Sequence, residues 1–199
     1  IKLYPISYLY DDFNGSKVRT TEFGSNHYSH IAYEKFLMKK PHLFNNYVKL
    51  IDSVVDFGYI SSYIPGDKLA IYASSIALCT YLTEHYKKKY PHLDVRRYVE
   101  DDPYENIIEA DVRITTILSG GTAVDIPNLR TVIMTNSLNS TTSNLQVLGR
   151  LRNLKDRDVK FYYLYCEQIK KQVEYHRNKL EMFKDRVLST KEFRANISL

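Results

Sequence analysis

Residues 68–75 read Lys-Leu-Ala-Ile-Tyr-Ala-Ser-Ser, and an amphipathic stretch follows them to about Lys89. The first six residues form a short apolar run rich in strand-forming types, which is typical of a buried strand. Ser74 and Ser75 are residue types that cap the start of a helix, because a serine oxygen accepts a hydrogen bond from a free backbone N–H. The stretch therefore predicts a strand, a short polar loop and a helix.

The same alternation continues along the chain. Further apolar runs predict strands over residues 112–118, 131–135 and 161–165, and helical patterns open near Ser143 and run from residue 168 to about 187. Strands that alternate with helices favour an α/β domain with a mainly parallel sheet and right-handed crossovers. Ligands of such sheets bind at the carboxyl ends of the strands, so the loops at that edge are the first place to look for function.

The first 60 residues follow a different pattern. Apolar positions recur at helical spacing over residues 29–40 and again over 43–58, with Pro41 between the two patterns and Gly58 placed as a C-cap. Residues 1–28 are Tyr-rich and mixed, with a turn predicted at 11–15 and short extended pieces around it. We expect residues 1–60 to form a mostly helical N-terminal extension, and residues 61–199 to form the α/β domain with its long C-terminal helix.

The charge balance suits a polyanionic partner. Lys and Arg number 28 against 23 Asp and Glu, which gives the 199-residue chain a net charge of +5. Several of the 18 tyrosines lie beside basic residues, as at residues 86–90, and aromatic and basic side chains together can stack bases and hold phosphates. A general bias toward Lys, Asn, Ile and Tyr explains the same composition without nucleic acid.

Cysteine usage and hydropathy indicate a soluble, intracellular protein. Cys79 and Cys166 have no neighbouring cysteine at the spacing of a metal site or a redox pair, so both are expected to be reduced. No apolar run approaches the length that a bilayer requires, and the first residues lack the pattern of a secretory signal. His27 and His30 lack a second pair of ligands, so no metal site is predicted.

Two further polar loops carry residues suited to phosphate. Residues 146–152 read Gln-Val-Leu-Gly-Arg-Leu-Arg, and residues 120–127 read Gly-Gly-Thr-Ala-Val-Asp-Ile-Pro. Arginine offers a planar, permanently charged fork to oxyanions, and glycine lets a backbone approach a ligand closely. Because both loops border predicted strands, they can converge with Ser74 and Ser75 on one ligand.

Three segments in this order resemble motifs IV, V and VI of superfamily 2 helicases. They are residues 71–75, 121–129 and 146–150, and the resemblance covers roughly residues 60–190. It implies the second of the two RecA-like lobes of these enzymes, a three-layer α/β fold. Within the superfamily the chain looks most similar to the UvsW-type and DNA-repair branch of phages and large DNA viruses, which implies the host cytoplasm as its location.

The resemblance assigns the nucleotide-facing residues. It implies that Arg150 is an arginine finger that reaches the γ-phosphate of ATP, and that Gln146 lies at the interface between lobes. A second arginine usually follows three residues after the first, but Asn153 stands there, so Arg152 is the candidate for that contact. The residues implied on the nucleotide side are completed by Asp125, Gly149 and Gly121.

A second group of residues matches loops that contact the nucleic-acid backbone through hydroxyls and amides in this family. This group comprises Ser74, Ser75, Ser119, Gly120 and Thr122. Less specific interpretations stay open for several positions. Asp125 could cap a turn before Pro127, and Arg150 could be an ordinary surface arginine.

Two motor elements are missing from the sequence. It contains no G-x-x-x-x-G-K-[S/T] phosphate loop and no D-E-x-x strand end. The resemblance therefore implies that ATP with Mg²⁺ binds mainly to an N-terminal RecA-like lobe of the same parent protein, and that this chain alone does not hydrolyse ATP. The start at Ile1 suggests a piece of something longer.

The expected partner is DNA, with RNA as the alternative. The alternatives are a non-catalytic nucleic-acid-binding module and a stand-alone α/β transferase.

Overall fold

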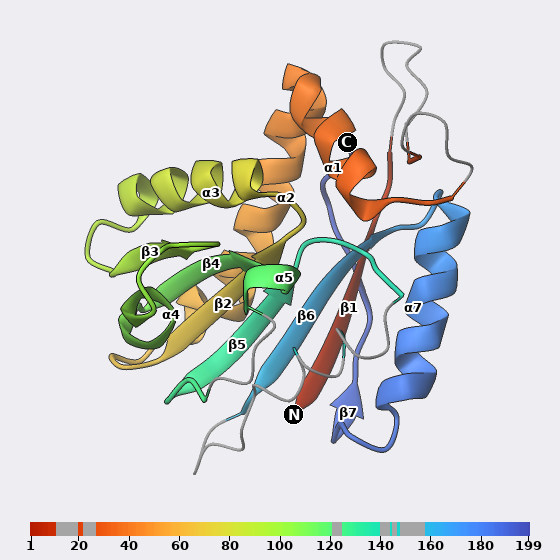
Figure 1. The fold of residues 1–199 in the computed structure, drawn as a ribbon. Coiled ribbons are helices and arrows are strands. Elements are labelled where there is room, and N and C mark those ends of the chain that lie inside the picture. The colour runs from red at the N-terminus through yellow and green to blue at the C-terminus, as the bar shows by residue number, and fades with distance from the viewer. Residues whose placement is uncertain (11–19, 22–26, 121–124, 140–143, 145–146, 148–157) are drawn as a thin grey trace.

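A mostly parallel sheet organises the computed structural model, which describes residues 1–10, 20–21, 27–120, 125–139, 144, 147 and 158–199 (Figure 1). Over these residues eight strands form one sheet, in the order β3-β4-β2-β5-β6-β1-β7, with β8 also paired to β1. All of these strand pairs are parallel. The strands are β1 (Lys2–Tyr8), β2 (Lys68–Ala73), β3 (Val95–Tyr98), β4 (Val112–Thr116), β5 (Leu129–Met134), β6 (Lys160–Cys166), β7 (Ser189–Thr190) and β8 (Phe193–Arg194).

Helices cover both faces of the sheet, which makes the fold a three-layer α/β sandwich (Figure 1). Alternate residues of each strand point to opposite faces. In β2, Leu69 and Ile71 pack into the core beneath helices α1, α2 and α3, whereas Ala70 and Tyr72 pack into the core that contains residues of α4 and α7. The helices are α1 (His30–Lys39), α2 (Pro41–Gly58), α3 (Ile76–Lys89), α4 (Glu105–Glu109), α5 (Ile117–Gly120) and α7 (Lys170–Phe183), with a short 3-10 helix at Ile60–Ser62.

The predicted α/β class is confirmed, and one predicted strand is shorter than expected. The apolar run over 112–118 forms β4 only as far as Thr116, and Ile117–Gly120 turn into α5. The hydroxyl of Thr116 accepts a hydrogen bond from the backbone N–H of Ser119 at 3.1 Å, which stabilises the turn in place of further strand. The helix predicted to open near Ser143 lies mostly outside the described residues.

The N-terminal segment, in which short extended pieces were predicted, contributes a full strand to the interior of the sheet. β1 pairs with β6 over seven residues, from Lys2↔Lys160 to Tyr8↔Cys166, and its other side pairs with β7 and β8. Proline is unusual inside a sheet because it lacks an N–H donor. Pro5 is accommodated because the outer pairing is interrupted there: β7 pairs with Lys2 and Leu3, and β8 pairs with Ile6 and Ser7. The turn predicted at 11–15 lies outside the described residues.

Gly58 has a different role from the predicted C-cap. It is the last residue of α2, and its backbone does not adopt the left-handed conformation that such a cap requires. A Cβ atom at this position would lie 2.6 Å from the ring of Tyr162 in β6. The glycine therefore allows the end of α2 to approach the sheet closely.

Within the described residues, none of the helices has both the length and the apolar character required to cross a bilayer.

Candidate nucleic-acid interface

The carboxyl ends of β4, β2 and β5 bring the predicted loops to one edge of the sheet. β2 lies between the other two strands, with Ala73 level with Thr116 of β4 and Tyr72 level with Met134 of β5. The chain leaving β2 therefore begins at Ser74 beside the start of α5 and beside the segment that follows β5. Figure 1 shows these three strand ends next to one another. Of the predicted polar loops, the structure describes residues 74–75 and 119–120 at this edge. Residues 121–124, 146 and 148–152 lie outside the described residues, so the convergence of the three loops stays a prediction.

Ser75 is the N-cap of α3. Its hydroxyl oxygen accepts a hydrogen bond from the backbone N–H of Leu78 at 3.2 Å, as the sequence predicts. A carboxylate from α1 completes the cap. Glu34 accepts hydrogen bonds from the backbone N–H of Ser74 at 2.7 Å, the backbone N–H of Ser75 at 2.8 Å and the hydroxyl of Ser75 at 2.5 Å. The amides of this loop are thus already bound to an internal anion.

The hydroxyl of Ser74 joins a second polar cluster. It accepts a hydrogen bond from Nδ2 of Asn136 at 2.6 Å and lies 2.7 Å from Nδ1 of His30. Burial lowers the pKa of His30, which favours a neutral ring whose Nδ1 accepts the serine proton. His30 comes from α1, Ser74 from the β2–α3 loop and Asn136 from the segment after β5, so the cluster ties three elements together.

Ser119 lies in α5 at the same edge. Its hydroxyl accepts hydrogen bonds from the hydroxyl of Thr116 at 3.0 Å and from the backbone N–H of Glu100 at 3.2 Å. Gly120 is the last residue of α5. These contacts fix the exit from β4 against the segment after β3, so that α5 is held where the predicted backbone-contacting loop begins.

The remaining predicted residues divide into two groups. Asp125 is exposed and precedes Ile126, whose side chain is buried in the core, in the segment that leads to β5. The others lie outside the described residues, namely Gly121, Thr122, Gln146, Gly149, Arg150 and Arg152. Their roles, including that of the proposed arginine finger, stay predictions.

The segment that follows β5 is anchored from both faces of the sheet. The hydroxyl of Tyr47 in α2 donates to the carbonyl of Thr135 at 2.7 Å, and Nζ of Lys179 in α7 donates to the carbonyl of Leu138 at 3.1 Å. The hydroxyl of Ser137 donates to the carbonyl of Leu164 in β6 at 3.0 Å. These buried contacts fix the start of the segment that leads to the arginine-containing loop.

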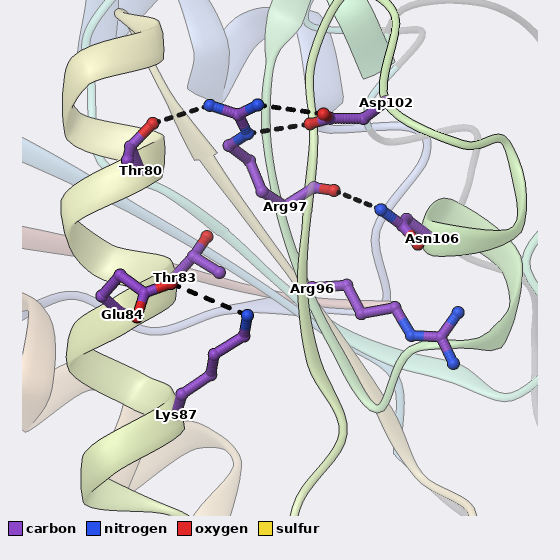
Figure 2. Close-up of a pocket in the computed structure, with 8 residues that line it drawn as sticks. All are labelled: Thr80, Thr83, Glu84, Lys87, Arg96, Arg97, Asp102 and Asn106. Atoms are coloured by element: carbon purple, nitrogen blue, oxygen red, sulfur yellow. Dashed lines mark hydrogen bonds and ion pairs between the residues drawn. The ribbon is translucent and has the colours of Figure 1, made fainter.

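A groove of about 310 Å³ lies elsewhere, between α3 and the edge strand β3 (Figure 2). Its cations are already paired. Arg97 donates to both carboxylate oxygens of Asp102 at 2.8 and 2.9 Å and to the hydroxyl of Thr80 at 2.9 Å, and this pairing lowers the pKa of Asp102. Lys87 lies 3.7 Å from Glu84. Because the charges compensate one another, and because no predicted site residue lines it, the groove is not the candidate interface.

Sequence reasoning missed His30, Glu34 and Asn136. A weak signal existed for Glu34, which is 1% exposed and lies among the buried positions Tyr33 and Leu37 of α1. A charged residue at a core-facing position of an amphipathic helix indicates a specific polar partner. Its spacing of four from His30 places both on one face of the helix. The identity of the partner loop, 40 residues away, has no signature in the sequence.

Comparison with solved structures identifies the fold. The T4 UvsW crystal structure superposes with a TM-score of 0.64 at 12% identity, over 98% of this chain and 41% of that one. Domain 2 of the DEAD-box helicase Mss116p, solved with an RNA duplex, gives 0.57 at 13% identity over 98% of this chain and 64% of that one. The chain has a RecA-like α/β fold similar to that of domain 2 of this DEAD-box helicase.

The C-terminal domain of S. cerevisiae Dbp5 gives a TM-score of 0.55 at 16% identity, over 75% of this chain and 84% of that one. No protein-family model and no curated protein matches the sequence. The chain spans about two fifths of the UvsW chain and under two thirds of the Mss116p chain. At these identities the likeness establishes the fold of the chain, and its activity is a separate question.

Proposed function

We propose that this chain is the C-terminal motor lobe of an ATP-dependent nucleic-acid helicase or translocase. The observation that supports this most directly is the arrangement of the sheet edge. β2 and β4 are adjacent parallel strands, so the chain leaves both of them at the same edge of the sheet, and the segments that resemble motifs IV and V include or follow these strand ends. Hydroxyls and backbone amides at this edge suit a phosphate backbone.

In this proposal ATP binds between two lobes and supplies the free energy for movement. Arg150 contacts the γ-phosphate, with Arg152 as a second phosphate contact and Gln146 at the lobe interface. The exposed carboxylate of Asp125 is of the right chemistry to accept hydrogen bonds from ribose hydroxyls. Because the sequence contains no G-x-x-x-x-G-K-[S/T] phosphate loop and no D-E-x-x strand end, we assign the Mg²⁺ ligands to the N-terminal lobe.

Closure of the cleft couples this chemistry to nucleic acid. Nucleotide binding favours the closed arrangement because Arg150 gains its phosphate contact only there. Loss of the γ-phosphate removes that contact, and the lobes separate. The residues at positions 74, 75, 119, 120 and 122 then contact the nucleic-acid backbone at a new position along the strand. DNA is the partner we propose first, with RNA as the alternative.

The arginine finger is tested in the protein that joins this lobe to its N-terminal lobe. Arg150→Ala should reduce nucleic-acid-stimulated ATP hydrolysis at least about 1,000-fold and should leave nucleic-acid affinity within a few-fold. The matched control is Arg186→Ala, which removes an exposed arginine after α7 and should hydrolyse ATP normally. Normal turnover by the Arg150→Ala protein would remove the proposed role.

A second measurement separates the motor from its alternatives. Titrating labelled single-stranded and duplex DNA and RNA at several salt concentrations reports affinity and the number of phosphates contacted. Salt-dependent binding together with stimulated ATP hydrolysis supports the motor. Binding without hydrolysis supports a non-catalytic module, and the absence of both supports a small-molecule transferase.

A further inference from the structure

The β2–α3 loop forms an oxyanion cradle. The backbone N–H groups of Ser74 and Ser75 and the hydroxyl of Ser75 all point to one carboxylate, that of Glu34. The cradle stands at the start of α3, a helix of 14 residues. The free N–H groups and the dipole of a helix N-terminus favour an anion at this position.

The anion that fills the cradle is buried without a cation. Glu34 is 1% exposed, and no ion pair joins it to a basic residue in the described part of the chain. Burial raises its pKa, and the hydrogen bonds from Ser75 and Ser74 oppose that shift. A neutral glutamine or asparagine could accept hydrogen bonds from the same donors with a smaller desolvation cost. The presence of a carboxylate at this position therefore indicates that the donors of the β2–α3 loop are arranged to bind a negatively charged group.

A second feature of the cluster points to an external ligand. Asn136 is 6% exposed, and its Nδ2 donates to the hydroxyl of Ser74, but no hydrogen-bond partner for its buried Oδ1 is found among the residues that the structure describes. Unsatisfied buried polar atoms are uncommon and are costly beside a polar network. A ligand that brings both an oxyanion and a hydroxyl or amino donor would satisfy this atom as well as the cradle.

The donors of the cradle cannot serve two anions at once. Each backbone N–H has one proton, and both are used by Glu34. α1 holds the carboxylate in place through other contacts: His30 bonds Ser74, and the hydroxyl of Tyr33 lies 2.7 Å from that of Tyr8 in β1. A phosphate can enter only after the Glu34 side chain has withdrawn.

We propose that Glu34 is an internal competitor for nucleic-acid phosphate, and that α1 is a latch which must release the Ser74–Ser75 cradle before a backbone phosphate binds there. This inference rests on the proposed function, because it takes the sheet edge to be a nucleic-acid track. It adds a regulatory step to that function: the N-terminal segment sets how much of the track is available.

The first test uses the 199-residue chain and a labelled single-stranded oligonucleotide. Glu34→Ala should bind about 3- to 10-fold more tightly than the wild type at the same salt, with a salt dependence steeper by about 0.7 in log–log slope, the contribution of one additional phosphate. Glu105→Gln is the matched control for charge, because Glu105 is exposed on α4. It should change affinity less than about twofold.

The second test needs no nucleic acid. Inorganic phosphate should raise the melting temperature of Glu34→Ala above that in chloride at equal ionic strength, because phosphate refills the emptied cradle. The wild type and Glu105→Gln should show no such difference. If Glu34→Ala fails to fold in chloride, recovery of a cooperative melt in phosphate carries the same information.

The outcomes separate the latch from the proposed function. One outcome is that the wild type binds the oligonucleotide while Glu34→Ala shows neither tighter binding nor a response to phosphate. In that case Glu34 only stabilises the structure of the loop, and the latch is wrong. A phosphate response in Glu34→Ala without oligonucleotide binding by any variant would overturn nucleic acid as the ligand, and with it the proposed function. If Glu34→Ala fails to fold in chloride and also fails to recover a cooperative melt in phosphate, the cradle does not bind phosphate and the latch is wrong.

Discussion

Lys179 is a buried amine that supports the segment after β5. Its side chain is 1% exposed, its Nζ donates to the carbonyl of Leu138 at 3.1 Å, and the nitrogen lies 5.1 Å from the ring centroid of Tyr163. No carboxylate pairs with it among the residues that the structure describes. Burial lowers the pKa of Lys179 to about 7, because the charged form is poorly solvated inside the protein.

This shift predicts a pH dependence of stability. The pKa of Lys179 is about 7 in the folded state and 10.5 in an unperturbed lysine, so the unfolded state binds more protons between these values. The free energy of unfolding should therefore rise as the pH rises from about 7 to about 8.5, by up to about 1.4 kcal/mol per pH unit. Lys179→Met should abolish this rise and should be the more stable protein at pH 7.

Urea unfolding across this pH range measures the effect. Lys170→Met is the control, because Lys170 is exposed at the start of the same helix, and it should keep the wild-type slope. Equal slopes in Lys179→Met and the wild type would show that the buried amine does not titrate in this window.

The role of a residue could be predicted from the sequence where its hydrogen-bond partner lies only a few residues away along the chain. Ser75 as an N-cap follows from three residues of sequence and is confirmed. Glu34 and Asn136 escaped prediction because their partners lie 40 and 62 residues away and are set by the fold. The arginine at position 150 could be given a role only by resemblance, and it stays a prediction.

At the scale of elements, the contact between α2 and β6 depends on Gly58. Gly58→Ala would place a Cβ 2.6 Å from the buried Tyr162 ring. Overpacking of this kind costs about 1–3 kcal/mol, offset by up to about 1 kcal/mol from the better helix propensity of alanine. Denaturant unfolding should show a net loss of stability. In a Tyr162→Leu background the penalty should shrink, and an unchanged penalty would place its origin elsewhere.

Elements with strong periodicity were predicted well. The apolar run at residues 68–73 coincides with β2, and the amphipathic pattern after Ser75 coincides with α3. Short extended pieces were predicted near the N-terminus, but the place of β1 inside the sheet was missed for two physical reasons. Pro5 argues against a strand paired on both sides, and the main partner, β6, is separated from β1 by almost the whole chain. Local sequence patterns do not encode pairing at such a distance.

For the whole molecule, the first 60 residues belong to the same core as the α/β elements. Ile6 and Tyr8 of β1, Leu37 of α1 and Leu50 of α2 share one buried cluster with Ile71 of β2. β1 also lies inside the sheet, between β6 and the β7–β8 edge. The contact surfaces of the extension and of the α/β part are therefore apolar and mutually dependent, although the sequence suggests a boundary near residue 60.

This arrangement predicts how the chain responds to division at that boundary. A fragment of residues 61–199 should not fold cooperatively by itself, because it exposes the face of the sheet that α1 and α2 cover and leaves β6 without its partner β1. Adding a separate peptide of residues 1–60 should restore a single cooperative melt, monitored by near-UV circular dichroism. A 1–60 peptide with Ile6 and Leu50 changed to Asp should fail to complement. Cooperative unfolding of residues 61–199 alone would instead establish them as an independent domain and the extension as an addition to it.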